Sequence, residues 1–226
     1  MKKILTLTTI LLTFCNAQPS SAQIPNQGLA TLITEAQKAN GTMLKTYSWN
    51  SRTEFLDNGK VEDTRIESVS CGPDGQLQRT MLNDQSAPLP RGFLRKKIAE
   101  DEKKKVEKYL GGLRKLLDQY TLPSAGKVLD FVSQAQISAP DANGLLQLTG
   151  SSVVVPGDSF TLSVVATTRQ TRKMQITTFF EGEMVTVSAT FTTLPGGLTH
   201  MQFGEVEVPG KGYTLQVHNY DYNANN

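Results

Sequence analysis

The chain has 226 residues, and Lys2 and Lys3 account for its formal net charge of +2. They precede an apolar run from Ile4 to Phe14, and Ser20-Ser21-Ala22 follows, which is typical of a secretory signal peptide cleaved after Ala22. The run is shorter than the ~20 apolar residues that span a bilayer. Without the two lysines, 21 of the 23 basic residues remain and balance the 21 acidic ones. We therefore expect neither an integral membrane protein nor a general nucleic-acid binder.

The mature chain, residues 23–226, has the length of a single domain, since β-rich domains often contain roughly 200–250 residues. Cys15 falls in the signal segment, so Cys71 is the one thiol that remains. We expect Cys71 to be a small buried or half-buried side chain, and a reactive or dimer-linking thiol is the alternative. The bulky Phe14 next to Cys15 disfavours a lipid anchor there, because such processing sites require small residues. The sequence predicts an exported protein of the periplasm or cell envelope.

A first amphipathic helix is predicted between Gln27 and Tyr47, with Asn26 in position to cap its start. Its apolar side chains recur at helical spacing. They are Leu29, Leu32, Ile33, Ala36, Met43 and Leu44.

From Tyr47 the apolar period changes to two, which predicts a three-strand meander. Residues 47–55 form its first strand, and Asp57-Asn58-Gly59-Lys60 has the composition of a tight hairpin turn. Residues 61–71 form the second strand, which runs back beside the first. A Gly-Pro-Asp-Gly turn follows, and residues 76–82 form the third strand.

After a proline-containing loop, a highly charged helical stretch ends at Pro123. Gly111-Gly112 interrupts it at a cost of roughly 1 kcal/mol per glycine, which predicts a kink or a break. Ser124 can cap a short third helix. The buried stripe of the charged stretch is predicted to contain Leu94, Ile98, Val106, Tyr109, Leu110, Leu113, Leu116, Leu117 and Tyr120.

Residues 145–222 are predicted to form about seven strands separated by glycine turns, which gives about ten strands in all. No strand-helix-strand unit repeats, so a doubly wound parallel sheet is disfavoured. The expected fold class is α+β, with one large antiparallel sheet curled around the helices.

Catalytic patterns are sparse. Val154-Val155-Pro156-Gly157-Asp158-Ser159 superficially matches the nucleophile block of GDSL hydrolases, but Ser159 would need a histidine base, and neither His200 nor His218 belongs to an Asp-x-x-His pattern. A strand follows Ser159 where a helix would supply oxyanion donors. No pair of histidines or cysteines has zinc-ligand spacing. We expect no enzyme activity, no metal and no cofactor, and a hydrolase using Ser159 is the least favoured alternative.

The charged helix carries a local excess of positive charge, because residues 91–118 include ten basic and five acidic side chains. At about 100° per residue, four lysines fall within roughly 20° of one line along an uninterrupted helix. Such a ridge is either a solvated helix face or a docking surface for anionic lipid headgroups or an acidic partner protein. The four lysines are Lys97, Lys104, Lys108 and Lys115.

Four stretches of the second half follow one another as a strand, a turn with a basic residue, a strand, a glycine turn and another strand. They are Phe160–Val165, Thr168–Ile176, Phe180–Val185 and Phe191–Leu198. In this order, and in the first helix and meander, the chain resembles the LolA-like periplasmic lipoprotein carriers and the outer-membrane lipoprotein-sorting superfamily. It departs from them in its first strand, where Tyr47–Phe55 replaces their glycine-basic-aromatic motif.

The resemblance implies an unclosed barrel whose helices cover its concave face and enclose an apolar cavity for acyl chains. It implies a non-enzymatic carrier that binds a lipid or an acylated protein. An envelope interaction module without a small ligand is the alternative, and a solid core behind Trp49 and Phe55 would favour it. The residues expected to line the cavity, or else to form ordinary core, are Leu29, Ile33, Met43, Trp49, Phe55, Leu94 and Ile98.

Overall fold

The computed structural model describes residues 26–72, 74–84, 93–121 and 124–225, with the side chains of 84, 93–100, 102, 103 and 121 left out of the description. The expected signal peptide and Cys15 therefore lie outside the described residues. Within the described ranges, no helix is long and apolar enough to cross a membrane.

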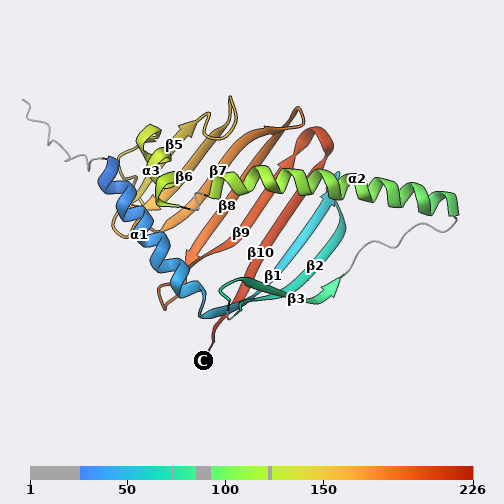
Figure 1. Ribbon diagram of the computed structural model, residues 1–226, viewed down its shortest axis with the longest axis horizontal. Helices are drawn as coiled ribbons and strands as arrows, with labels where there is room; N and C mark the ends of the chain where they lie inside the picture. Colours follow the sequence, from blue (N-terminus) through green and yellow to red (C-terminus); the bar gives the residue numbers. More distant parts are fainter. Residues whose placement is uncertain (1–25, 73, 85–92, 122–123, 226) are drawn as a thin grey trace, which may run out of the picture.

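Ten strands form one antiparallel sheet, in the order β3-β2-β1-β10-β9-β8-β7-β6-β5-β4 (Figure 1). The two edge strands, β3 and β4, do not pair with each other, so the sheet is not closed. The strands are β1 (Tyr47–Asp57), β2 (Lys60–Cys71), β3 (Leu77–Asp84), β4 (Gln136–Ile137), β5 (Leu145–Ser151), β6 (Ser159–Val165), β7 (Thr171–Phe180), β8 (Glu183–Thr193), β9 (Thr199–Val208) and β10 (Tyr213–Ala224).

Three α-helices, α1 (Asn26–Leu44), α2 (Phe93–Leu117) and α3 (Ala125–Gln134), lie across the same face of the sheet (Figure 1). Short 3₁₀ turns follow α2 at Asp118–Thr121 and β9 at Pro209–Lys211. The predicted α+β fold, with about ten antiparallel strands in an unclosed sheet covered by helices, is confirmed. Of the strands, six rather than about seven lie after Leu145, because β4 precedes that residue.

Residues that pair across the sheet separate into an apolar and a polar row, because successive side chains of a strand point to opposite faces. The apolar row runs from β1 to β5 through Phe55, Leu215, Val206, Val187, Ile176, Phe160 and Gly150. The row next to it, on the opposite face, runs through Glu54, Gln216, Glu205, Ser188, Gln175, Thr161 and Thr149. One face is thus packed against helices and the other is polar.

The largest core cluster lies where α1 and α3 cover β5, β6 and β7. Ile33 and Val132 are fully buried there, and both pack in one cluster with Phe160 of β6. Ser124 caps α3 as predicted, since its hydroxyl accepts a hydrogen bond from the Lys127 backbone N–H at 3.4 Å.

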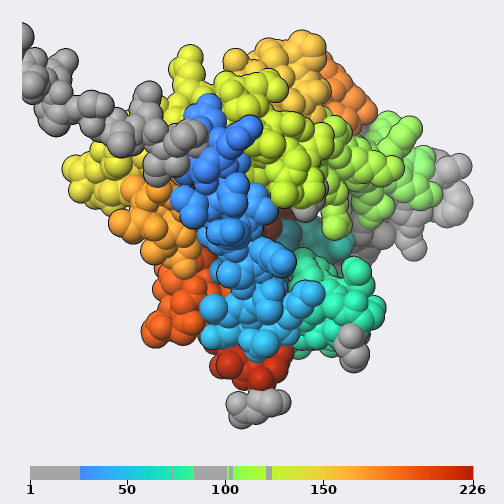
Figure 2. All heavy atoms as spheres, turned by 60° about the vertical axis from the view of Figure 1, so that its left-hand side comes forward, coloured from blue at the N-terminus to red at the C-terminus, as the bar shows by residue number. Residues whose placement is uncertain are grey.

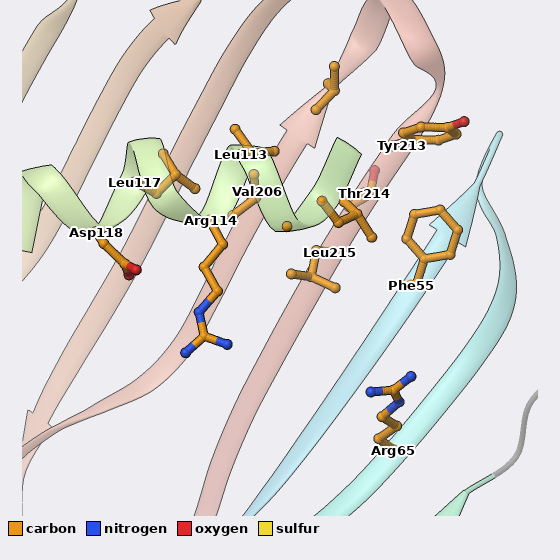
Figure 3. A pocket seen from close by; sticks show the side chains of 13 residues that line it. Phe55, Arg65, Leu113, Arg114, Leu117, Asp118, Val206, Tyr213, Thr214 and Leu215 are labelled. Atoms are coloured by element: carbon orange, nitrogen blue, oxygen red, sulfur yellow. The ribbon is translucent and has the colours of Figure 1, made fainter. Parts of the chain in front are cut away.

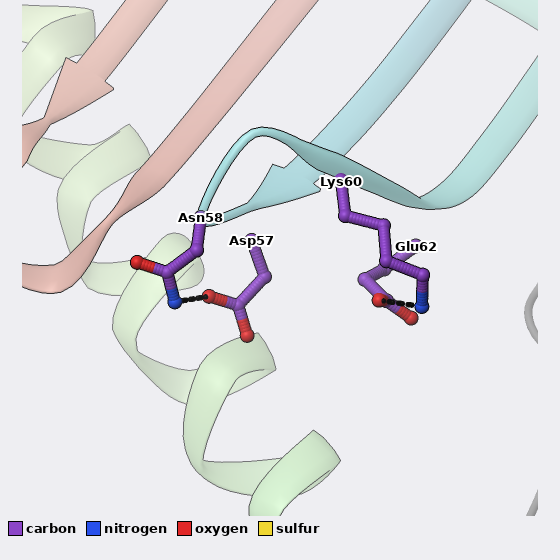
Figure 4. Close-up of polar contacts among 4 residues, drawn as sticks. All are labelled: Asp57, Asn58, Lys60 and Glu62. Carbon is purple, nitrogen blue, oxygen red and sulfur yellow. Dashed lines mark hydrogen bonds and ion pairs between the residues drawn. The ribbon is translucent and has the colours of Figure 1, made fainter.

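The hairpin between β1 and β2 is confirmed. Asn58 and Gly59 have φ values of +49° and +77°, and two consecutive positive φ values are what a type I′ turn requires. The Asn58 amide donates to the Asp57 carboxylate at 2.8 Å, and Lys60 pairs with Glu62 at 2.6 Å (Figure 4).

The predicted kink or break at Gly111-Gly112 is wrong, because α2 continues without interruption from Phe93 to Leu117. Gly112 faces the ring of Phe180, and a Cβ at this position would lie 2.7 Å from the Phe180 Cζ atom. Gly112 therefore lets the helix lie close to β7, and tertiary packing overrides the low helix propensity of glycine.

Candidate functional site

A cavity of about 410 Å³ lies between the second half of α2 and the strands β1, β2, β9 and β10 (Figure 3). It is open to solvent, and most of its lining side chains are apolar. The lining residues are Phe55, Arg65, Leu110, Gly111, Leu113, Arg114, Leu117, Asp118, Val206, Val208, Tyr213, Thr214 and Leu215.

The roof of the cavity comes from one side of α2. Leu110, Leu113 and Leu117 are three, four or seven positions apart, so they lie on the same helix face. The floor comes from the apolar row of the sheet, in which Phe55 pairs with Leu215 and Leu215 pairs with Val206. The molecular surface in Figure 2 has a recess between α1 and α2, and atoms of the sheet lie at its bottom.

Aromatic rings support α2 at one end of the cavity. The ring centroid of Tyr109 lies 5.1 Å from that of Phe180 and 6.1 Å from that of Tyr213. Tyr213 also meets the lining residue Phe55 edge to face at 5.4 Å. These rings fill the space between helix and sheet on the Tyr109 side of α2. The cavity lies beside them, and Phe55 and Tyr213 line it together with leucine and valine side chains.

Two arginines supply the positive charge of the lining. Arg114 extends from α2 over the strands, and Arg65 rises from β2 beside Phe55 (Figure 3). Arg65 contacts the Asp63 carboxylate at 3.5 Å, and its side chain is 49% exposed. Asp118, four residues after Arg114, adds one carboxylate to the lining.

Of the expected lining residues with described side chains, Phe55 alone lines this cavity. Leu29 and Ile33 are packed in the core cluster of α1 and α3. Trp49 is buried in a stack on Tyr222, with ring centroids 5.3 Å apart. Met43 is half-buried near the end of α1 and lies beside Gly197. Leu94 and Ile98 belong to α2, but their side chains lie outside the description.

The predicted docking lysines lie on α2. Lys104, Lys108 and Lys115 are exposed, and the side chain of Lys97 is not among the described ones. The buried side chains Tyr109, Leu113 and Leu116 project from the opposite side of the helix, so the three described lysines face away from the sheet.

The Pro-Gly-Asp segment before Ser159 forms a tightly bonded turn. Asp158 is 1% exposed, and its carboxylate accepts hydrogen bonds from the backbone N–H groups of Val153, Val154 and Val155 at 2.6–2.8 Å. The Tyr120 hydroxyl donates a fourth bond at 2.6 Å. Burial raises the pKa of the Asp158 carboxyl, but these hydrogen bonds outweigh burial and hold the pKa below its ordinary value.

Ser159 has no histidine beside it in the sheet. It begins β6, whereas His200 and His218 lie on β9 and β10, and β7 and β8 separate β6 from β9. Three strand spacings place β9 about 14 Å from β6. No group of three or more metal-ligating side chains occurs among the described residues.

Sequence reasoning identified Leu110, Leu113 and Leu117 as part of a buried helix stripe and missed Val206, Tyr213 and Leu215 as their partners. Alternation along the chain predicts which face a strand residue occupies. It does not predict that β10 lies next to β1, which places Leu215 beside Phe55.

No family model and no curated protein matches the chain. Chains of solved structures do match it, among them the following two. A DUF1329 family protein from Desulfovibrio piger ATCC 29098 has 10% identity and a TM-score of 0.43, over 88% of this chain and 93% of that one. A LolA superfamily protein from Nitrosomonas europaea has 11% identity and a TM-score of 0.37, over 87% and 94%. Likenesses of this degree identify neither a ligand nor an activity.

Proposed function

We propose that this is an exported, non-enzymatic protein of the cell envelope that binds a lipid, or the acyl chain of an acylated protein, between α2 and the sheet. The observation that carries the proposal is the open cavity of about 410 Å³ with its leucine, valine and aromatic lining. Its volume lies within the roughly 300–1,000 Å³ that is typical of small-molecule sites.

Water inside this cavity would find few hydrogen-bond partners. Liquid water occupies about 30 Å³ per molecule, so a cavity of this size holds on the order of ten waters. Most of them would face apolar side chains such as Leu110 and Leu215, which offer no hydrogen bonds. An alkyl chain that displaces them gains about 0.8 kcal/mol for each methylene removed from water.

The other parts of the proposal come from the sequence. Export rests on the predicted signal peptide at residues 1–22, and the mature chain would be one domain, residues 23–226. Lys97, Lys104, Lys108 and Lys115 are the proposed docking residues for an anionic membrane surface or an acidic partner. No catalytic role is assigned to Ser159.

The test measures how tightly the protein binds a neutral apolar dye, N-phenyl-1-naphthylamine. The fluorescence of the dye reports its binding. Leu215→Trp adds a large ring to the cavity floor, and we expect at least tenfold weaker dye binding than in the wild type. Leu56→Trp is the matched control, because Leu56 is also a half-buried strand leucine, is adjacent to Phe55 and by alternation points to the other face.

Native mass spectrometry of gently purified protein supplies the second measurement, and we expect lipid adducts on the wild type that Leu215→Trp lacks. A wild type without adducts that takes up no dye would overturn the proposal. Equal dye binding by Leu215→Trp and Leu56→Trp would place the binding site elsewhere and overturn the assignment to this cavity.

A further inference from the structure

We propose that the cavity selects an amphiphile with an anionic head, a carboxylate or a phosphate, and that Arg65 and Arg114 hold this head. The inference rests on the proposed function, because it names the chemical class of the ligand for the same cavity. It adds that the alkyl chain lies along the apolar lining while the head remains at the two guanidinium groups.

The two arginines reach the cavity from different elements. Arg65 projects from β2 and Arg114 from α2, and both line the same apolar space (Figure 3). A guanidinium group presents a planar set of N–H donors that matches the oxygens of a carboxylate or a phosphate. A cavity with a leucine and valine lining and two such groups has the polarity of an amphiphile rather than of a plain hydrocarbon.

Arg65 lies farther from its carboxylate partner than Arg52 of β1 and Arg79 of β3 lie from theirs. Arg52 meets Glu54 at 2.6 Å and Arg79 meets Glu67 at 2.9 Å, whereas Arg65 meets Asp63 only at 3.5 Å. All three arginine side chains are 49% exposed, so exposure does not explain the difference. The looser pair leaves Arg65 better able to turn its donors toward a ligand.

Two carboxylates lie near the two guanidinium groups, Asp118 in the lining and Asp63 at 3.5 Å from Arg65. An anionic head therefore has to take the place of the Asp63 carboxylate at Arg65, which the long distance of that pair favours. A cationic head would face both arginines.

The experiment compares compounds with one chain length and different heads. Dodecanoate, dodecyl phosphate, dodecanol and dodecyltrimethylammonium are titrated against the protein loaded with N-phenyl-1-naphthylamine, and displacement of the dye is measured. For the wild type we expect dodecanoate or dodecyl phosphate to bind about tenfold more tightly than dodecanol, and the cation to bind more weakly than dodecanol.

Arg65→Gln and Arg114→Gln should each reduce this preference several-fold while affinity for dodecanol is retained, which also reports that the cavity is intact. Arg52→Gln is the matched control, because Arg52 has the same exposure and lies on β1 facing the other side of the sheet. It should leave all four affinities unchanged. Comparison of the two anions shows whether the head is a carboxylate or a phosphate.

The outcomes separate the two proposals. Binding of dodecanol and dodecanoate with equal affinity, or a preference that survives both arginine substitutions, overturns the anionic-head inference and leaves lipid binding in place. Preferential binding of the cation overturns it as well. Uptake of the dye with no displacement by any of the four compounds also overturns the anionic-head inference. A protein that takes up no dye and carries no lipid adducts overturns the proposed function itself.

Discussion

Replacement of Asp158 by asparagine tests the buried turn that joins β5 to β6. One carboxylate oxygen accepts from the Val153 N–H, and the other accepts from the Val154 and Val155 N–H groups and from the Tyr120 hydroxyl. Asparagine replaces one oxygen with an NH₂ group that can only donate. At least one bond is then lost and donors face each other, while the remaining bonds lose the assistance of the negative charge.

The expected loss follows from these bonds. A hydrogen bond to a charged group contributes about 1.5–3 kcal/mol, and a buried group left without its partner adds a penalty of similar size. We therefore expect Asp158→Asn to lower the free energy of unfolding by about 3 kcal/mol or more at pH 7. For a domain of this size that loss lowers the melting temperature by about 6–12 °C.

The effect should depend on pH with a definite sign. The pKa of Asp158 is lowered in the folded protein, so its stabilising contribution is complete above the unfolded pKa of about 3.9 and is lost as the pH falls through the folded pKa. The difference between wild type and Asp158→Asn should stay constant from about pH 5 to pH 8 and shrink at lower pH.

Urea denaturation followed by circular dichroism, at pH 7 and at pH 3, measures both effects. Asp141→Asn is the control, because Asp141 also accepts two backbone N–H bonds, at 2.8 and 2.9 Å, but is exposed. It should cost less than about 1 kcal/mol, since both N–H groups donate to one oxygen, which asparagine keeps, and the side chain is exposed to water. A cost below about 1 kcal/mol for Asp158→Asn, or one that does not change with pH, would refute the reasoning.

Two further predictions concern α2. Gly112→Ala should destabilise the protein by about 1–3 kcal/mol because its Cβ meets the Phe180 ring, whereas Gly111→Ala, with no atom within 4 Å of the added Cβ, should stabilise it by up to about 1 kcal/mol. Urea denaturation of the pair measures this, and equal effects would contradict the proposed contact. Replacing Lys104, Lys108 and Lys115 together by glutamine should weaken sedimentation with vesicles that contain phosphatidylglycerol, most strongly at low salt. Unchanged sedimentation would remove these lysines from the docking surface.

Local signals in the sequence predicted much of the fold. Asn58-Gly59 predicted the first hairpin, and Ser124 predicted the start of α3, because each acts through its own backbone neighbourhood. The continuity of α2 could not be predicted in this way. The requirement for glycine at position 112 comes from Phe180, which is 68 positions away in the sequence.

The candidate site was predicted less well than the fold. Leu29 and Ile33 have the same helical spacing as cavity-lining residues would have, but α3 packs against α1 and buries them in the core. Phe55 lines the cavity, yet its partners Leu215 and Val206 come from the last two strands. Spacing along the chain identifies a buried face and does not identify what lies opposite it.

The pairing of β1 with β10 also determines when the cavity can form during folding. Tyr47 pairs with Ala224 and Phe55 with Leu215, so the first strand in the chain, β1, lies next to the last one, β10. Contacts between such distant segments form slowly, because a long loop must close first. The meander β1–β3 and the layer formed by β5, β6 and α3 can each begin to fold from nearby residues. The cavity floor forms only when β10 pairs with β1. A chain that ends before Tyr213 would therefore lack part of the cavity lining as well as the strand that connects β1 to β9.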